Sequence, residues 1–132
     1  MLSIYSTCKS SELTIEYVLL VLLHPSSGGY YKVKLRPGFR VICLNTNYCT
    51  RLNPWTMFDP VDPGKQLKWL TEELHAAEMD NDKVHIIGHI PPDNRECTQA
   101  WLFNYLRIID RFQDTVLAAY YGHTHRYFML HV

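Results

Sequence analysis

The chain has 132 residues, 47% of them hydrophobic, and its 13 basic residues balance its 13 acidic ones. This composition suits one globular domain with a single core. The zero net charge offers no basic excess of the kind that binds nucleic-acid polymers, and no apolar run approaches the ~20 residues of a transmembrane helix. We therefore predict neither a nucleic-acid partner nor a membrane span.

The first 27 residues differ from the rest of the chain. The run YVLLVLL, residues 17–23, has about the length of a short signal-peptide core, but Glu12 and Glu16 precede it and no clean small-residue cleavage site follows. We favour a buried strand or a helical turn over a signal peptide here. The turn-rich stretch HPSSGG then marks a break, so residues 1–27 form an unassigned N-terminal segment and residues 28–132 the folded domain.

Beyond this break, strand patterns alternate with helical ones. Strands are predicted where the sequence alternates or is continuously apolar, and they cover residues 30–35, 39–46, 83–88 and 115–122. One helix lies before the third of these strands and a second, over residues 98–112, lies before the fourth. This alternation predicts an α/β fold in which helices flank a sheet.

The first helix is the better signalled of the two. Asp62 can cap it and Pro63 suits its first position. An apolar stripe at helical spacing follows, formed by Leu67, Leu70, Leu74 and Ala77. We therefore expect the helix to begin at Asp62 and to bury this stripe against the sheet.

Two predicted strands run into a glycine followed by a histidine, at His89 and at the GHTH motif with His123 and His125. Ligands in open α/β sheets lie at the carboxyl ends of strands, and three imidazoles suit Zn²⁺, iron or Mn²⁺. If the backbone stays extended, His123 and His125 leave on the same side. The GHTH cluster favours metal ligation because it packs poorly, whereas His89 alone, and His85 within its strand, are each more simply structural.

Four cysteines include no C-x-x-C pair, which disfavours a zinc ribbon. Cys49 and Cys97 each follow a predicted strand, in loops where a disulfide could form. The spacing leaves a disulfide and two free thiols equally open.

Six stretches of the chain match motifs of a known enzyme family. They are GGYY, PGFRVICLNTNYC, DPGKQLKWLTEELHAAE, DKVHIIGHIPP, NYLRI and YYGHTH, and they span about residues 28–125. YYGHTH resembles the calcineurin-like metallophosphoesterases in general, and KVHIIGHIPP with LNTNYC and NYLRI resembles their acid sphingomyelinase branch. The resemblance implies that residues 28–132 form about the later half of a metallophosphoesterase sandwich, in which two sheets stack between helices.

The resemblance also implies a site and a reaction. Family members cleave phosphodiesters such as sphingomyelin at a two-zinc centre, where a metal-bridging water attacks phosphorus, and relatives in the branch cleave nucleotide-type phosphodiesters. The family's metal ligands fall on His89, His123 and His125, and its paired cysteines fall on Cys49 and Cys97. Members are secreted or lysosomal, which suits a disulfide.

The chain departs from the family pattern in one respect. An Asp-x-His, a Gly-Asp and a Gly-Asn-His-Glu/Asp motif complete the family's site, and none occurs upstream of residue 28. Without the bridging aspartate we expect one zinc ion or none, assign no catalytic residue, and expect a truncated hydrolase that is inactive alone. The alternatives are a non-catalytic fragment that self-associates through an exposed sheet, and an incomplete sequence with no function of its own.

Overall fold

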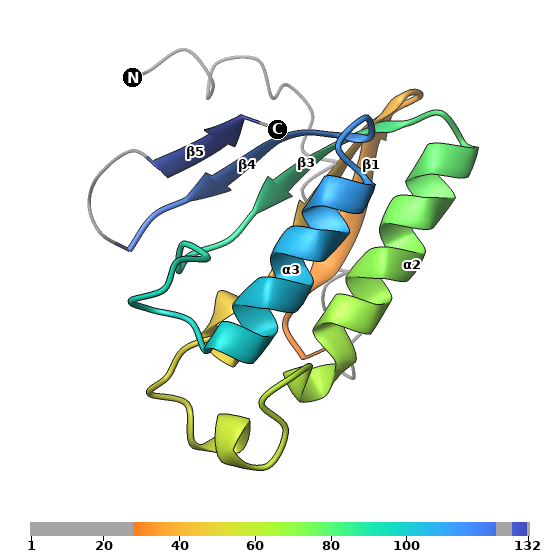
Figure 1. Ribbon diagram of the computed structural model, residues 1–132. Coiled ribbons are helices and arrows are strands. Elements are labelled where there is room, and N and C mark those ends of the chain that lie inside the picture. Colours follow the sequence, from red (N-terminus) through yellow and green to blue (C-terminus); the bar gives the residue numbers. More distant parts are fainter. Residues whose placement is uncertain (1–27, 124–127, 132) are drawn as a thin grey trace, which may run out of the picture.

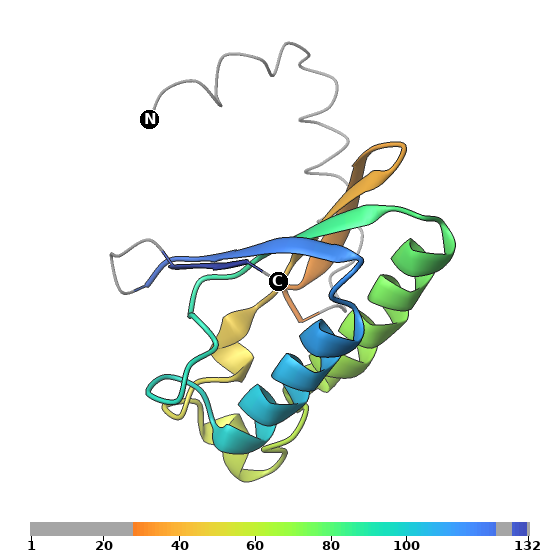
Figure 2. The ribbon, with the colours of Figure 1, turned by 45° about the horizontal axis from the view of Figure 1, so that its top comes forward.

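A computed structural model describes residues 28–123 and 128–131. Its centre is a five-stranded sheet in the order β1-β2-β3-β4-β5. Two helices, α2 (Gln66–Met79) and α3 (Gln99–Arg111), lie side by side on one face of this sheet (Figure 1, Figure 2). The α/β class is therefore confirmed. The run at residues 17–23 and the predicted ligand His125 lie outside the described residues.

The sheet is mixed, with parallel strands at its centre. β2 is parallel to β3 and β3 to β4, while the edge strands β1 and β5 are antiparallel to their neighbours. The strands are β1 (Tyr31–Arg36), β2 (Phe39–Cys43), β3 (Lys83–Ile87), β4 (Val116–Tyr121) and β5 (Phe128–His131). The first four occupy the predicted strands. β5 was not predicted, because its four residues are too few to show an alternating pattern.

The parallel strands give the sheet two distinct edges. The C-terminal ends of β2, β3 and β4 lie along one side of the sheet, and these strands end at Cys43, Ile87 and Tyr121. We call this side the carboxyl edge, which is distinct from the edge strands β1 and β5. The chain enters these strands at the opposite side, which we call the amino edge. Loops that are far apart in the sequence therefore meet at the carboxyl edge.

The helix α2 begins later than predicted. A short 3-10 turn, Pro63–Lys65, precedes it, and a left-handed φ of 67° at Gly64 interrupts regular helix there. Asp62 still acts as a cap, because its carboxylate accepts hydrogen bonds from the backbone N–H groups of Leu67 (2.6 Å) and Lys68 (3.0 Å). The predicted apolar stripe is confirmed, since all of its members are buried: Leu67, Leu70, Leu74 and Ala77.

The helix α3 supplies the largest side chains of the core. It lies within the predicted range of residues 98–112. Trp101 and Tyr105 are fully buried, with their rings stacked and their centroids 5.1 Å apart. Neither α2 nor α3 is long and apolar enough to cross a membrane, nor is any other helix among the described residues.

The second face of the sheet carries no helix within the described residues (Figure 2). Ile87 and Tyr120 pair across β3 and β4 and are both exposed. His85 lies between Phe39 and Tyr120, with ring centroids 4.8 and 5.4 Å away. His85 is therefore a structural residue of this sheet face, and apolar side chains beside it are exposed.

A cluster of matched charges closes the amino edge. The buried carboxylate of Asp82 accepts hydrogen bonds from the Arg40 guanidinium and from the Gly38 backbone N–H, and Nζ of Lys34 lies 2.8 Å from it. The Lys34 ammonium, then the Arg40 guanidinium and the Gly38 N–H, lower the pKa of Asp82 to about 2. Arg40 also pairs with Asp80, so each charge of this cluster has an opposite partner.

Candidate metal centre

Two of the predicted ligands, His89 and His123, come together at the carboxyl edge. A Gly-His pair follows β3, which ends at Ile87, and another follows β4, which ends at Tyr121. Nε2 of His89 lies 3.3 Å from Nδ1 of His123, and the two rings are nearly perpendicular at 82°. Both side chains are exposed to solvent. The third predicted ligand, His125, lies outside the described residues.

Close packing requires glycine at position 88. A Cβ atom there would lie 2.8 Å from Cγ2 of Thr46 and 2.9 Å from Cε1 of Tyr121. Tyr121 is itself fixed, because its buried hydroxyl shares a hydrogen bond with that of Tyr105, and burial raises the pKa of both hydroxyls. Gly88 therefore leaves room for the Thr46 methyl group and the Tyr121 ring beside the backbone that leads to His89.

A buried threonine holds the backbone at His89. Oγ1 of Thr46 accepts hydrogen bonds from the backbone N–H groups of His89 (3.1 Å) and Ile90 (2.7 Å). Thr46 was not predicted as a site residue. The available signal was its position at the end of the predicted strand 39–46, where a buried polar residue needs hydrogen-bond partners.

The backbone turns sharply at His123. The N–H of Gly122 donates to the carbonyl of His89 at 3.0 Å, which ties the two histidine segments together. His123 then adopts a left-handed φ of 59°, which is uncommon outside glycine and clusters at functional sites. The condition of extended backbone is therefore not met at His123, after which the chain returns as the antiparallel strand β5. The same-side argument for His123 and His125 no longer holds.

One carboxylate faces the histidine pair from outside. Oε2 of Glu96 lies 3.5 Å from Nε2 of His123, the ring nitrogen that points away from His89. The Asp93 carboxylate fixes Glu96 by accepting a hydrogen bond from its backbone N–H at 2.9 Å. A carboxylate on the far ring nitrogen is the usual outer partner of a metal-bound imidazole. Glu96 was not predicted, since a glutamate in an irregular loop carries no motif.

A disulfide fastens the loop that carries Glu96. Cys49 and Cys97 are joined, with S–S 2.08 Å, which is the pairing that the resemblance implied. The Arg51 side chain adds hydrogen bonds to the carbonyls of Cys97 (3.2 Å) and Asn94 (2.6 Å). The loops that follow β2 and β3 therefore form one cross-linked unit at the carboxyl edge.

The donor set fits part of a zinc site. Two imidazole nitrogens bound to one tetrahedral zinc ion, each at ~2.0–2.1 Å, lie roughly 3.3 Å apart, and the separation between His89 and His123 is 3.3 Å. Among the residues that the structure describes, no group of three or more His, Cys, Asp or Glu side chains is arranged to hold a metal ion. A complete ligand set therefore needs groups in addition to these two imidazoles.

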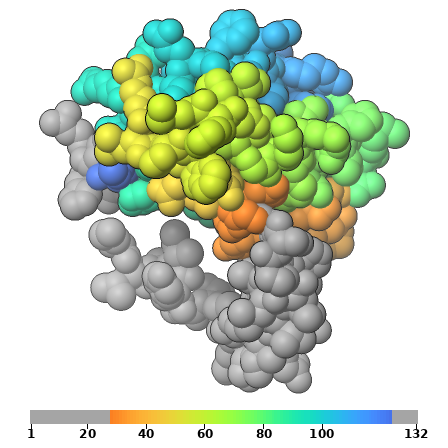
Figure 3. Space-filling view, turned by 90° about the horizontal axis from the view of Figure 1, so that it is seen from below, coloured from red at the N-terminus to blue at the C-terminus, as the bar shows by residue number. Residues whose placement is uncertain are grey.

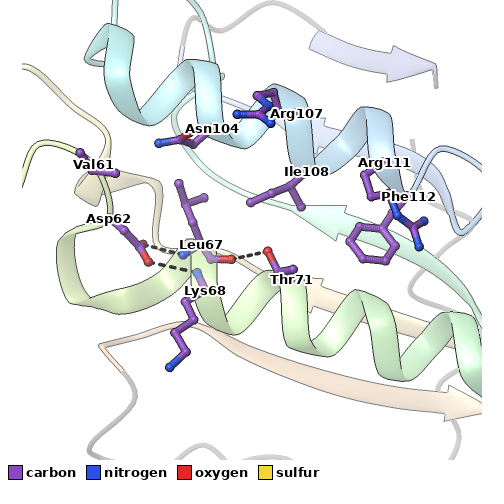
Figure 4. A pocket seen from close by; sticks show the side chains of 10 residues that line it. All are labelled: Val61, Asp62, Leu67, Lys68, Thr71, Asn104, Arg107, Ile108, Arg111 and Phe112. Atoms are coloured by element: carbon purple, nitrogen blue, oxygen red, sulfur yellow. Dashed lines mark hydrogen bonds between the residues drawn. The ribbon is translucent and has the colours of Figure 1, made fainter.

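A hollow of about 420 Å³ lies away from this site, between α2 and α3 (Figure 4). Figure 4 shows Leu67 and Ile108 directed into the space between the two helices, whereas the Lys68 side chain points away from α3. None of the candidate histidines lines it. We assign this hollow no part in the metal centre.

The fold and the two Gly-His segments agree with the family that the sequence of the chain matches. The chain belongs to the calcineurin-like phosphoesterase family, whose model matches residues 11–127. The predicted resemblance to this family is therefore confirmed. The division of the chain at residue 28 stays a prediction.

Within this family, the chain is similar to the sphingomyelin phosphodiesterases. Those of Bos taurus and Homo sapiens are each 50% identical to it over 98 residues, which cover 74% of this chain and 15% of theirs. The cyclic GMP-AMP phosphodiesterase SMPDL3A of Homo sapiens is 36% identical over 108 residues, which cover 75% of this chain and 24% of the relative. The chain thus spans about 15% of the length of the first two relatives.

Proposed function

We propose that this chain contributes to zinc-dependent hydrolysis of a phosphodiester, with sphingomyelin or a related lipid as the substrate. The observation that carries the proposal is the 3.3 Å approach of Nε2 of His89 to Nδ1 of His123 at the carboxyl edge. His125, two residues further on, is the proposed third ligand. The similarity to sphingomyelin phosphodiesterases supports the choice of substrate.

The residues of the chain would hold and orient the ligands. A bound zinc ion supplies a Lewis acid for a phosphoryl oxygen and a water molecule of lowered pKa. Thr46 and Gly88 fix the backbone from which His89 presents Nε2. Glu96, placed at Nε2 of His123, would accept a hydrogen bond from the N–H of that nitrogen and leave the Nδ1 lone pair free to bind the ion.

The charge of the site limits how much metal it can hold. Neutral imidazoles offset none of the charge of two adjacent zinc ions, and Glu96 lies on the outer nitrogen of His123. We therefore propose that His89, His123 and His125 retain one ion at most, and weakly. On its own the chain would then be inactive, because a two-metal displacement needs both ions.

We also propose a secreted or lysosomal location. The support is the disulfide between Cys49 and Cys97, since such bonds persist in oxidising compartments. Alkylation of chain recovered from a secretory expression system should modify the free thiol of Cys43 and spare the disulfide pair. Modification of Cys49 and Cys97 as well would contradict the disulfide on which the proposed location rests.

The first test is the amount of zinc bound per folded chain, measured by elemental analysis. Wild type should retain up to one zinc ion, and His123→Ala should retain none. His75→Ala is the matched control, because His75 is exposed on α2 and pairs there with Glu78. Zinc that is unchanged in His123→Ala would overturn the proposed ligand set, and two ions per chain would show that missing ligands are replaced.

A nucleotide-type phosphodiester is the second candidate substrate. The similarity to a cyclic GMP-AMP phosphodiesterase favours it. Because the chain alone is proposed to be inactive, the test measures binding of product-like probes to the zinc-loaded chain by calorimetry. Tighter binding of phosphocholine supports the sphingomyelin-type substrate, whereas tighter binding of adenosine monophosphate supports the nucleotide.

A non-catalytic role in self-association is the alternative that the open sheet face favours. Ile87 and Tyr120 expose apolar surface there, and such surface marks interaction sites. Sedimentation velocity should then show association that rises with concentration and is lost in Ile87→Lys. Leu106→Lys, at an exposed position of α3, is the control, and equal association in both variants would reject this face as the interface.

A further inference from the structure

The loop between β2 and α2 exposes an unusual group of large apolar side chains. Leu52, Trp55, Met57 and Phe58 expose 90%, 69%, 86% and 83% of their surface. We call residues 52–58 the apolar loop. Single exposed apolar residues are ordinary, but a contiguous group of this size marks an interaction site.

Hydrogen bonds of its own backbone and polar side chains hold the apolar loop in shape. Asn53 caps the 3-10 turn Pro54–Met57 by accepting a hydrogen bond from the N–H of Trp55 at 3.1 Å, and its amide donates to the carbonyl of Asn47 at 3.1 Å. The N–H of Phe58 closes the turn on the carbonyl of Trp55 at 3.0 Å. A defined turn thus presents the side chains of Trp55 and Phe58, whose ring centroids are 5.9 Å apart.

The apolar loop stands at the carboxyl edge, where His89 and His123 also lie. It follows β2, and the disulfide between Cys49 and Cys97 fastens its start to the loop that follows His89. Figure 3 views the molecule from below, where the yellow and yellow-green segment that includes the apolar loop lies at the surface. A surface that covered this loop would therefore face the same edge as the histidines.

The shape and charge of the apolar loop indicate what covers it. These side chains are largely exposed and none of them lines the hollow between α2 and α3, whereas small-molecule sites are concave. Residues 52–58 include no charged side chain, and the flanking Arg51 and Asp59 carry opposite charges. A locally uncharged surface with Trp and Phe suits the boundary between headgroups and acyl chains of a lipid layer.

We propose that the apolar loop inserts into a phospholipid surface and thereby sets the carboxyl edge against it. This inference rests on the proposed function only for its purpose, which is to deliver a lipid phosphodiester to the histidines. Insertion itself needs neither a metal ion nor turnover.

The test measures partition of the full chain into phosphatidylcholine vesicles by flotation. The loop variant is Met57→Ser with Phe58→Ser. The matched control is Met79→Ser with Phe103→Ser, which removes the same two side-chain types from helical positions that are 74% and 62% exposed. Partition should fall about tenfold or more in the loop variant, because two inserted side chains lose their apolar burial, and by less than about twofold in the control. Far-ultraviolet circular dichroism checks that both variants fold.

Trp55 provides a second readout that reports on insertion directly. Trp101 is fully buried and Trp69 is partly buried against the core, so Trp55 is the tryptophan that an added lipid layer would reach. Its emission should shift to shorter wavelength on vesicle binding and should be quenched by lipids with brominated acyl chains. Trp55→Phe should abolish both signals and keep the partition, because phenylalanine retains an aromatic ring at the same site.

Several outcomes would overturn the proposal. Partition that is equal in the loop variant and the control places the lipid contact elsewhere, and partition that disappears in about 0.5 M salt reports charge and not apolar insertion. Self-association that depends on the apolar loop, without vesicle binding, assigns the surface to a second copy of the chain. His123→Ala separates this inference from the proposed function, because it should lose zinc and still bind vesicles. If wild type binds zinc but does not bind vesicles, the proposed insertion of the apolar loop is rejected and the proposed function is not.

Discussion

The two edges of the sheet differ in how their polar groups are matched. At the amino edge, the buried Asp82 meets Lys34, Arg40 and the Gly38 N–H, and Arg40 also meets Asp80. At the carboxyl edge, two exposed imidazoles turn ring nitrogens toward one another. The charges of the amino edge neutralise each other, whereas the carboxyl edge presents the two imidazoles that we propose as metal ligands.

The backbone is constrained at both edges. The carboxyl edge contains the close approach at Gly88 and the left-handed turn at His123, and the amino edge contains left-handed residues at Gly38 and Asn81. Strained or tightly packed backbone persists only where its surroundings over-determine it. At the carboxyl edge those surroundings are the Thr46 hydroxyl and the disulfide, and changing them tests whether this edge is as preorganised as the comparison suggests.

Removing the disulfide should have the largest effect on stability. Cys49→Ser with Cys97→Ser opens a covalent loop of sequence separation 48, and we expect the free energy of unfolding to fall by about 4 kcal/mol because the unfolded chain gains freedom. Urea denaturation followed by circular dichroism measures it. Cys43→Ser, at a free and half-buried thiol, should cost less than about 1.5 kcal/mol. A double variant as stable as wild type would show that hydrogen bonds alone hold the carboxyl edge.

Gly88→Ala should have the next largest effect. The new Cβ would enter the space of the Thr46 methyl group and the Tyr121 ring, so we expect a loss of about 1–3 kcal/mol from overpacking and weaker zinc binding as His89 moves. Gly122→Ala is the matched control, because its Cβ would lie 3.7 Å from Nδ1 of His89, an ordinary contact. Equal losses of stability in the two variants, again by urea denaturation, would remove the special role of Gly88.

Thr46→Val tests the buried hydroxyl at constant shape. It leaves the N–H groups of His89 and Ile90 without their acceptor, which should cost about 1–3 kcal/mol. Hydrogen exchange at both amides should accelerate as well. Thr46→Ser keeps the hydroxyl and should retain most of the protection. A valine variant with wild-type stability and exchange would mean that the hydroxyl does not position His89.

Much of the fold could be predicted because its signals are local. The alternation of β1, the apolar run of β2 and the stripe of α2 each lie within one segment, and each segment adopts the expected element. The departures come from single residues whose conformation the pattern does not encode. Gly64 delays α2 past Asp62, and His123 turns the chain into β5, a strand too short to show a period.

The site could be predicted only in part, because its contacts are long-range. The GHTH pattern favoured His123 as a ligand, whereas the position of His89 alone favoured a structural role and the family resemblance implied that it is a ligand. Thr46 lies 43 residues from the His89 that it holds, and Glu96 meets His123 across two loops. No spacing rule joins such pairs. The spacing also left the pairing of Cys49 and Cys97 open, and the family resemblance implied the pairing that the structure contains.

The amino edge should show its role in the acid stability of the domain. The pKa of Asp82 is lowered from 3.8 to about 2 by Lys34, Arg40 and the Gly38 N–H, so its ionised form stabilises the folded state. That contribution is fully present above the unfolded pKa of about 4 and is lost as the pH falls through the folded pKa of about 2, below which folded and unfolded chains are both protonated. Thermal melting between these two pH values should therefore show a falling melting temperature in wild type.

Asp82→Asn should flatten this acid slope and leave zinc binding unchanged, since the amino edge is remote from the histidines. The slope should not vanish, because hydrogen bonds from the Asp62 N–H and from Arg111 also lower the pKa values of Asp59 and Glu78. Lys34→Gln should give an intermediate slope, because Lys34 is the largest cause of the shift at Asp82. If wild type and Asp82→Asn lose stability in parallel on acidification, the amino edge does not carry this pH dependence, and the contrast between matched and open edges would rest on geometry alone.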